Sequence, residues 1–95
     1  MKLRWSLRAR RDLRSIKVYL LERNPAASER IGAEIARAIR RLEVFPQLGR
    51  PAHRSNLRLM QVPGLPYLIP YRVNGENVEI VSVCDERMER PPEWE

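Results

Sequence analysis

The hydrophobic spacing of this 95-residue chain changes its period once, near the middle, and this change constrains the fold more than any other feature. In the first half, apolar residues recur every three to four positions, which is typical of a helix that buries one side. In the second half they alternate with polar residues, which is typical of half-buried β-strands. A chain of this length supplies one domain with a single modest core. We therefore expect one α+β domain over residues 1–95, with a helical hairpin on an antiparallel sheet.

Two helices are predicted after a short first strand at residues 2–5. Ser6 is a suitable N-cap, and the apolar residues after it predict a helix of about 15 residues. Asn24 and Pro25 end this helix and begin the next, because Asn caps helices well and Pro fits the first helical position. The second helix has an apolar stripe formed by Ile31, Ile35, Ala38, Ile39 and Leu42. Phe45-Pro46 then stops the helix.

Three further strands are predicted over residues 57–62, 67–73 and 78–83. Pro63-Gly64 turns the chain between the first two, and Asn74-Gly75 is a strong signal for a tight hairpin between the last two. The element order is then β–α–α–β–β–β. Pro70 has no N–H to give to the ladder, so we expect a bulge or an edge position there.

The net charge indicates an acidic partner. Lys and Arg total 18 against 12 Asp and Glu, which gives a formal charge of +6. All but two of the basic residues are arginine, whose planar fork pairs well with phosphate and carboxylate. A strongly basic small domain favours nucleic acid or an acidic protein surface, and composition alone does not separate the two.

Several classes of protein are disfavoured by what the chain lacks. No apolar run approaches the roughly 18–20 residues that span a bilayer, and the basic N-terminus has no secretory signal. The one cysteine, Cys84, forms no internal disulfide or zinc cluster, and the one histidine, His53, has no neighbouring ligand or nucleophile. We expect a cytoplasmic protein that needs no metal or small cofactor.

An ordered series of short motifs covers nearly the whole chain, from Trp5 to Arg87. They are Trp5, Ala9, Asp12-Leu13, Asn24-Pro25-Ala26-Ala27, Phe45-Pro46, Gly49-Arg50, Pro66-Tyr67-Leu68-Ile69-Pro70-Tyr71-Arg72-Val73, Ile80-Val81-Ser82-Val83 and Arg87. In order and spacing, the chain resembles the RelE/ParE superfamily of toxins from bacterial type II toxin–antitoxin systems, and its ParE-like branch in particular. The resemblance implies the β-α-α-β-β-β fold and a cognate antitoxin.

The resemblance leaves two activities to separate, because RelE-type and ParE-type members share a fold. RelE-type members cut mRNA in the ribosomal A site and need basic side chains on the sheet to stabilise the transition state. One of their arginines falls at Leu68 here, and their lysine pair falls near Leu59 and Gln61. Their C-terminal His or Tyr falls near Asp85, where many ParE relatives carry His. Leucine cannot neutralise a developing phosphate charge, so we assign no catalytic residue and expect no enzymatic activity.

ParE-type members instead inhibit DNA gyrase, and the resemblance implies that target here. The candidate target-binding residues are Arg58, Arg72 and Arg87. The implied partner is a DNA-binding antitoxin that wraps the toxin in a hetero-oligomer. Two alternatives stay open. One is a ribosome-dependent mRNA endonuclease that uses the same three arginines in a rearranged site. The other is a non-toxic module kept for binding an antitoxin.

Structural roles compete with these functional ones. Arg72 is suited to a cross-strand pair with Glu79 or Asp85, and Arg87 to anchoring the chain by an ion pair. Asp12, in the middle of a helix, most simply pairs with nearby arginines. Residues 88–95 fit either a flexible tail or, through Trp94, an anchor for a partner.

Overall fold

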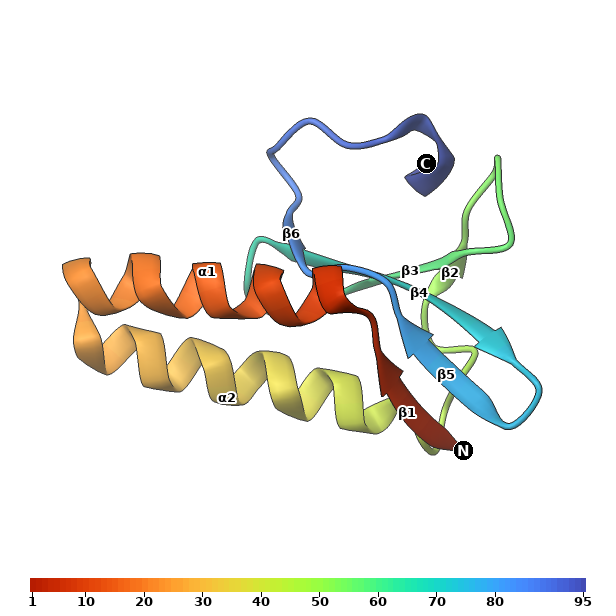
Figure 1. Ribbon diagram of the computed structural model, residues 1–95, viewed down its shortest axis with the longest axis horizontal. Coiled ribbons are helices and arrows are strands. Elements are labelled where there is room, and N and C mark those ends of the chain that lie inside the picture. The colour runs from red at the N-terminus through yellow and green to blue at the C-terminus, as the bar shows by residue number, and fades with distance from the viewer.

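The two helices form a hairpin with the predicted boundary between them. The computed structural model describes all 95 residues, with α1 at Leu7–Arg23 and α2 at Pro25–Arg41 (Figure 1). The Ser6 side chain accepts a hydrogen bond from the N–H of Ala9, and that of Asn24 accepts one from the N–H of Ala27. These caps satisfy N–H groups that have no partner within the helix, which is why each helix begins where it does.

The sheet has six strands, which are the predicted first strand, the predicted meander and two short strands that the sequence did not predict. The strands are β1 (Lys2–Trp5), β2 (Arg50–Pro51), β3 (Arg58–Gln61), β4 (Tyr67–Asn74), β5 (Asn77–Ile80) and β6 (Cys84–Asp85). Their order is β1-β5-β4-β3-β2, with β6 paired to β4 beyond the end of β5. β1 runs parallel to β5, and all the other pairs are antiparallel. The α+β class and the β3–β4–β5 meander are confirmed.

The predicted strand at residues 78–83 is wrong in its second half. The ladder stops at Ile80, and the backbone N–H groups of Val81 and Ser82 both point to the carbonyl of Pro70, at 2.9 and 3.4 Å. Pairing with β4 resumes only at Cys84. This bulge lies opposite Pro70, which has no N–H to donate to the ladder. The irregularity expected at Pro70 is therefore found at the point where the pairing of the strands is interrupted.

The main core lies between the helices and one face of the sheet. Its buried members include Ile35 and Ile39 of α2, Leu42 at the C-cap of that helix, and Ile69 and Tyr71 of β4. The apolar stripe of α2 therefore faces the sheet, as its spacing predicts. The helices extend beyond the sheet at the hairpin end, where α1 joins α2 (Figure 1). Neither helix is both long and apolar enough to cross a membrane.

A second, smaller core covers the opposite face of the sheet, which we call the second face. It is formed by the buried residues Ala52, Leu57, Leu59, Leu68 and Trp94. The C-terminal segment crosses this face after β6 and ends in a short 3-10 helix, η1 (Pro92–Trp94) (Figure 1). The backbone N–H of His53 donates to the carbonyl of Glu95 at 2.6 Å, and the Ser55 hydroxyl donates to the carbonyl of Glu93. The segment that the sequence left as a flexible tail or partner anchor thus packs on the chain's own sheet.

Candidate functional site

The second face is apolar at the positions where a sheet nuclease of this fold would need positive charge. Leu59 is 2% exposed and Leu68 is 4% exposed. Both lie in the cluster that Trp94 closes. Gln61 follows on β3, is exposed, and donates from its side-chain amide to the carbonyl of Leu65. Leu59, Leu68 and Gln61 themselves therefore offer no cation to a phosphate.

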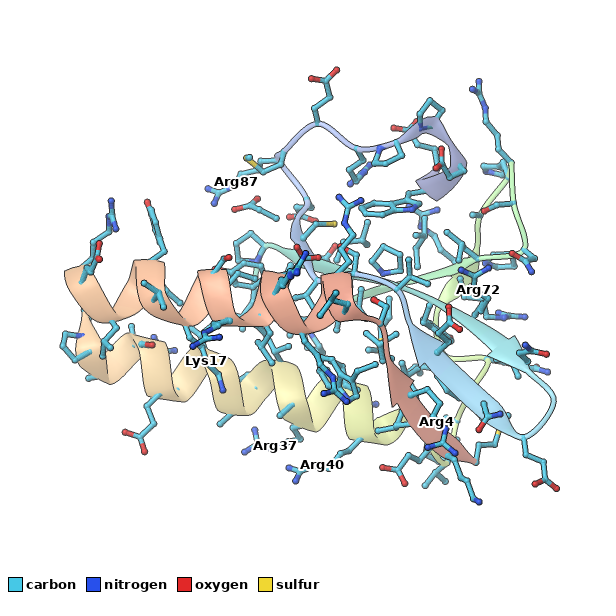
Figure 2. All side chains as sticks on the ribbon, viewed as in Figure 1. Arg4, Lys17, Arg37, Arg40, Arg72 and Arg87 are labelled. Atoms are coloured by element: carbon cyan, nitrogen blue, oxygen red, sulfur yellow. The ribbon has the colours of Figure 1, made fainter.

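Arg72 is the candidate residue that belongs to the second face. It alternates along β4 with Tyr71, which faces the helices, and it is paired in register with Glu79 of β5. Its Nε lies 3.0 Å from Oε1 of Glu79, although it is not aligned for a hydrogen bond and is shielded from solvent. The side chain is 39% exposed. The expected cross-strand pair with Glu79 is present, and the side chain, labelled in Figure 2, is only partly buried.

Arg58 faces the other side of the sheet. It is paired in register with Tyr71, so its side chain projects toward the helix side. Its Nη1 donates to the carbonyl of Gly49 at 2.7 Å and lies 3.4 Å from that of Gln47. Arg58 therefore supports the loop after α2 and does not share a site with Arg72.

Arg87 forms a third, separate feature in the turn after β6. Its Nε and Nη2 donate to the two carboxylate oxygens of Asp85 at 2.9 and 2.6 Å, and its backbone N–H donates to the same carboxylate. These hydrogen bonds from Arg87 lower the pKa of the Asp85 carboxyl. Burial raises the pKa of the nearby Tyr67 hydroxyl. The expected structural ion pair is present, and the Arg87 side chain is still 74% exposed.

Asp12 has a role that sequence reasoning missed. Its Oδ2 accepts hydrogen bonds from the Ser82 hydroxyl at 2.5 Å and from the backbone N–H of Val83 at 3.1 Å. Its nearest arginine, Arg8, has its Nε 3.9 Å away. The predicted pairing of Asp12 with a helix arginine is present as this long ion pair, but the closer contacts are those with Ser82 and Val83, by which the carboxylate holds the bulge between β5 and β6 against α1.

The remaining reactive side chains show no site of their own. His53 is exposed in the loop after β2. Burial raises the pKa of the Cys84 thiol to about 11, which suppresses the reactive thiolate. No three His, Cys, Asp or Glu side chains lie close enough together to hold a metal ion.

A groove of about 490 Å³ runs along the exposed side of α1. It is lined by apolar and basic side chains together: Trp5, Leu13 and Val18 with Arg10, Arg14 and Lys17. Two further apolar side chains of α1, Leu7 and Leu21, are 62% and 58% exposed. A helix of a monomer rarely exposes apolar residues in such number beside a basic stripe, so this face is a candidate for binding a protein.

Residues 3–90 match the family model described as "ParE toxin of type II toxin-antitoxin system, parDE". This chain belongs to the ParE toxin family. Putative toxin Y4kP of Sinorhizobium fredii is 36% identical over 90 residues, covering 95% of this chain and 93% of that protein. Toxin RelE2 of Caulobacter vibrioides is 34% identical over 79 residues, covering 83% and 88%.

The fold of the ParE family also appears in a solved structure. A chain of the "Chromosomal ParDE TA system from P. aeruginosa" matches with a TM-score of 0.81 and 23% identity, over 90% of this chain and 95% of that one. At that identity the match supports the fold alone. Together with the family match, it confirms the resemblance drawn from the motifs: the chain is a type II toxin–antitoxin toxin of the RelE/ParE superfamily.

Proposed function

We propose that this ParE-family toxin inhibits DNA gyrase and has no nuclease activity of its own. The observation that supports this most directly is the apolar cluster on the second face. A RelE-type nuclease needs positive charge there, and this chain has Leu59 and Leu68 buried beneath Trp94. Introducing a catalytic cation would first require removing the covering segment, so a change of one residue would not restore the site.

The accessible arginines supply a surface for a target. Arg72 and Arg87 each keep part of their guanidinium exposed while a carboxylate on the same chain fixes its position. Arginines held in this way lose less entropy on binding than free side chains. Arg58 is no longer a candidate for binding the target, because its guanidinium is hydrogen-bonded to the loop after α2.

The first test follows macromolecular synthesis just after the protein is induced without an antitoxin. Pulse labelling should show DNA synthesis falling first while translation continues. Purified protein should then inhibit supercoiling by gyrase, and Arg87→Ala should weaken that inhibition more than the matched surface variant Arg30→Ala. Arg30 lies exposed on α2, away from the second face.

Two other results would point elsewhere. An immediate loss of translation, with mRNA cleaved in translating extracts, would identify a ribosome-dependent endonuclease and reject gyrase. If the folded protein changes neither DNA synthesis nor translation, a non-toxic module that binds an antitoxin becomes the better description of its function.

We also propose that an antitoxin occupies the groove on α1. The apolar and basic side chains that line this groove suit an amphipathic segment with acidic residues on its polar side. The solved relative from P. aeruginosa is described as a ParDE toxin–antitoxin system, which supports a partner of this class. The test is affinity for the product of an adjacent antitoxin gene. The double variant Arg10→Glu, Arg14→Glu should bind much more weakly, and Arg30→Glu should bind normally. Equal effects would reject the groove as the site.

A further inference from the structure

Two arginines line one pocket on the second face, and the proposed gyrase inhibition does not explain why they share it. The pocket has a volume of about 310 Å³ and lies where the first turn of α1, the loop before β3, strand β4 and the C-terminal segment meet. Arg8 and Arg72 line it, with Asn56, Glu93 and Trp94 among their neighbours. The pocket exists only because the C-terminal segment folds over the sheet, so its walls come from both ends of the chain.

Arg8 is held between an aromatic ring and a carboxylate. The centre of its guanidinium lies 4.6 Å from the centroid of the Trp94 ring, a cation–π contact. Its Nε forms a long ion pair with Asp12 at 3.9 Å, beyond hydrogen-bonding distance. The Arg8 side chain makes no hydrogen bond within the chain, so its N–H groups have no donor contact to give up when a ligand binds.

Arg72 reaches the pocket from the sheet. Glu79 fixes its Nε end by charge, and that nitrogen is shielded from solvent without an aligned hydrogen bond. Asn56 adds an exposed amide on the pocket's edge that forms no hydrogen bond with the rest of the chain.

We propose that this pocket binds a phosphate group, held by Arg8 and Arg72 and assisted by Asn56. Two arginines and an asparagine that line one pocket from three different segments suit a tetrahedral anion with oxygens in several directions. A single carboxylate has two oxygens in one plane and would leave part of this set unused. The phosphate can belong to a DNA strand or be a free anion, and both present the same group to the two guanidiniums. The proposal goes beyond gyrase inhibition and is tested without gyrase.

The negative charge of Glu93 allows a second test of phosphate binding in this pocket. Glu93 lines the same pocket, is exposed, and its carboxylate forms no ion pair. A bound phosphate would lie near that negative charge and be weakened by it. Replacing Glu93 by glutamine should therefore strengthen binding, whereas loss of either arginine should weaken it. A structural role for the arginines predicts no such opposite effects.

The experiment measures the fluorescence anisotropy of a short labelled oligothymidylate titrated with the full-length protein. Removing one charge-assisted contact should weaken binding about tenfold, so Arg8→Ala and Arg72→Ala should each show that loss. Arg72→Lys, which keeps a cation beside Glu79, provides a second variant should Arg72→Ala fold poorly. Arg40→Ala is the matched control, because it removes one positive charge from the exposed side of α2 (Figure 2). Its effect should stay within about twofold, since distant exposed charges are screened by salt.

Competitors identify the source of the phosphate. Sodium phosphate that displaces the oligothymidylate from wild type, but not from Arg8→Ala, assigns the pocket to a single free anion. Displacement by unlabelled oligothymidylate alone assigns it to the DNA backbone. The proposal is overturned if Arg40→Ala weakens binding as much as Arg8→Ala, or if an uncharged methylphosphonate strand binds equally well. It is also overturned if no phosphate probe binds, or if polyglutamate binds more tightly than either.

Discussion

The hydroxyl of Tyr71 accepts a hydrogen bond from the backbone N–H of Gly49 at 2.8 Å, and this bond joins the central strand β4 to the loop after α2. The same hydroxyl donates to the carbonyl of Pro46 at 2.7 Å. A Cβ at position 49 would lie 2.7 Å from Cε1 of Tyr71, so only glycine fits beneath the ring. The motif residues Phe45-Pro46 and Gly49 therefore belong to a loop whose shape is set by one buried tyrosine, and Arg50 begins β2.

Tyr71→Phe should lower the free energy of unfolding by about 1–3 kcal/mol, because two loop groups lose their partner inside the protein. Urea denaturation of the purified protein measures the change. Tyr19→Phe is the control, since Tyr19 is 56% exposed and its hydroxyl makes no hydrogen bond within the chain. A loss for Tyr71→Phe no greater than that for Tyr19→Phe would show that water replaces the hydroxyl.

Asp12→Ala should destabilise the protein by about 2 kcal/mol, since the Ser82 hydroxyl and the Val83 N–H both lose a charged acceptor. Thermal and urea unfolding give the value. Glu22→Ala removes another carboxylate from α1, and it should change stability by less than about 0.5 kcal/mol because Glu22 is solvent-exposed. If the two variants lose equal stability, the charge of the helix matters and the bulge contact does not.

The elements that the sequence predicted are those specified by neighbouring residues. Ser6 and Asn24 cap the helix that follows each of them, and Asn74-Gly75 turns between β4 and β5. The break after Ile80 was missed because it depends on Asp12, 70 positions from Ser82. No local pattern contains such a contact. Pro70 was the one residue whose chemistry signalled that the ladder would fail nearby.

The sequence indicated roles for single residues of the candidate site, but it did not show which of these residues lie together in the fold. The Arg72–Glu79 pair followed from cross-strand spacing, whereas Arg87 was expected to form an ion pair without its partner, Asp85, being identified. The stacking of Arg8 on Trp94 joins the two ends of the chain, and only the fold brings them together. Leu59 and Leu68 marked where a nuclease would need charge, but the segment that covers them was not visible in any pattern.

Trp94→Ala should cost about 3 kcal/mol, because the ring is 5% exposed and closes the second core. Urea unfolding measures the loss. Met88→Ala in the same segment is the control, since Met88 is 66% exposed and should change stability little. If both variants match wild type, the C-terminal segment contributes nothing to stability and the second face is covered only weakly.

The Asp85–Arg87 pair should make stability depend on pH at the acid end. Hydrogen bonds from Arg87 lower the pKa of Asp85 in the folded protein below its usual value of 3.8. A lowered carboxyl pKa means that the pair's contribution is fully present above that usual value and is lost as pH falls through the lowered one. The contribution should be small and should weaken in salt, because the Arg87 side chain is 74% exposed.

Carboxyl-carbon NMR titration tests this directly, and the Asp85 midpoint should lie below 3.8 in the wild type. Arg87→Gln should raise that midpoint, since the charged donor that holds the carboxylate is gone. Asp85→Asn should remove part of the acid-induced drop in melting temperature and leave melting above pH 5 nearly unchanged. A midpoint that Arg87→Gln does not move would mean that the pair opens in solution, leaving the exposed Arg87 guanidinium without a fixed position for any partner.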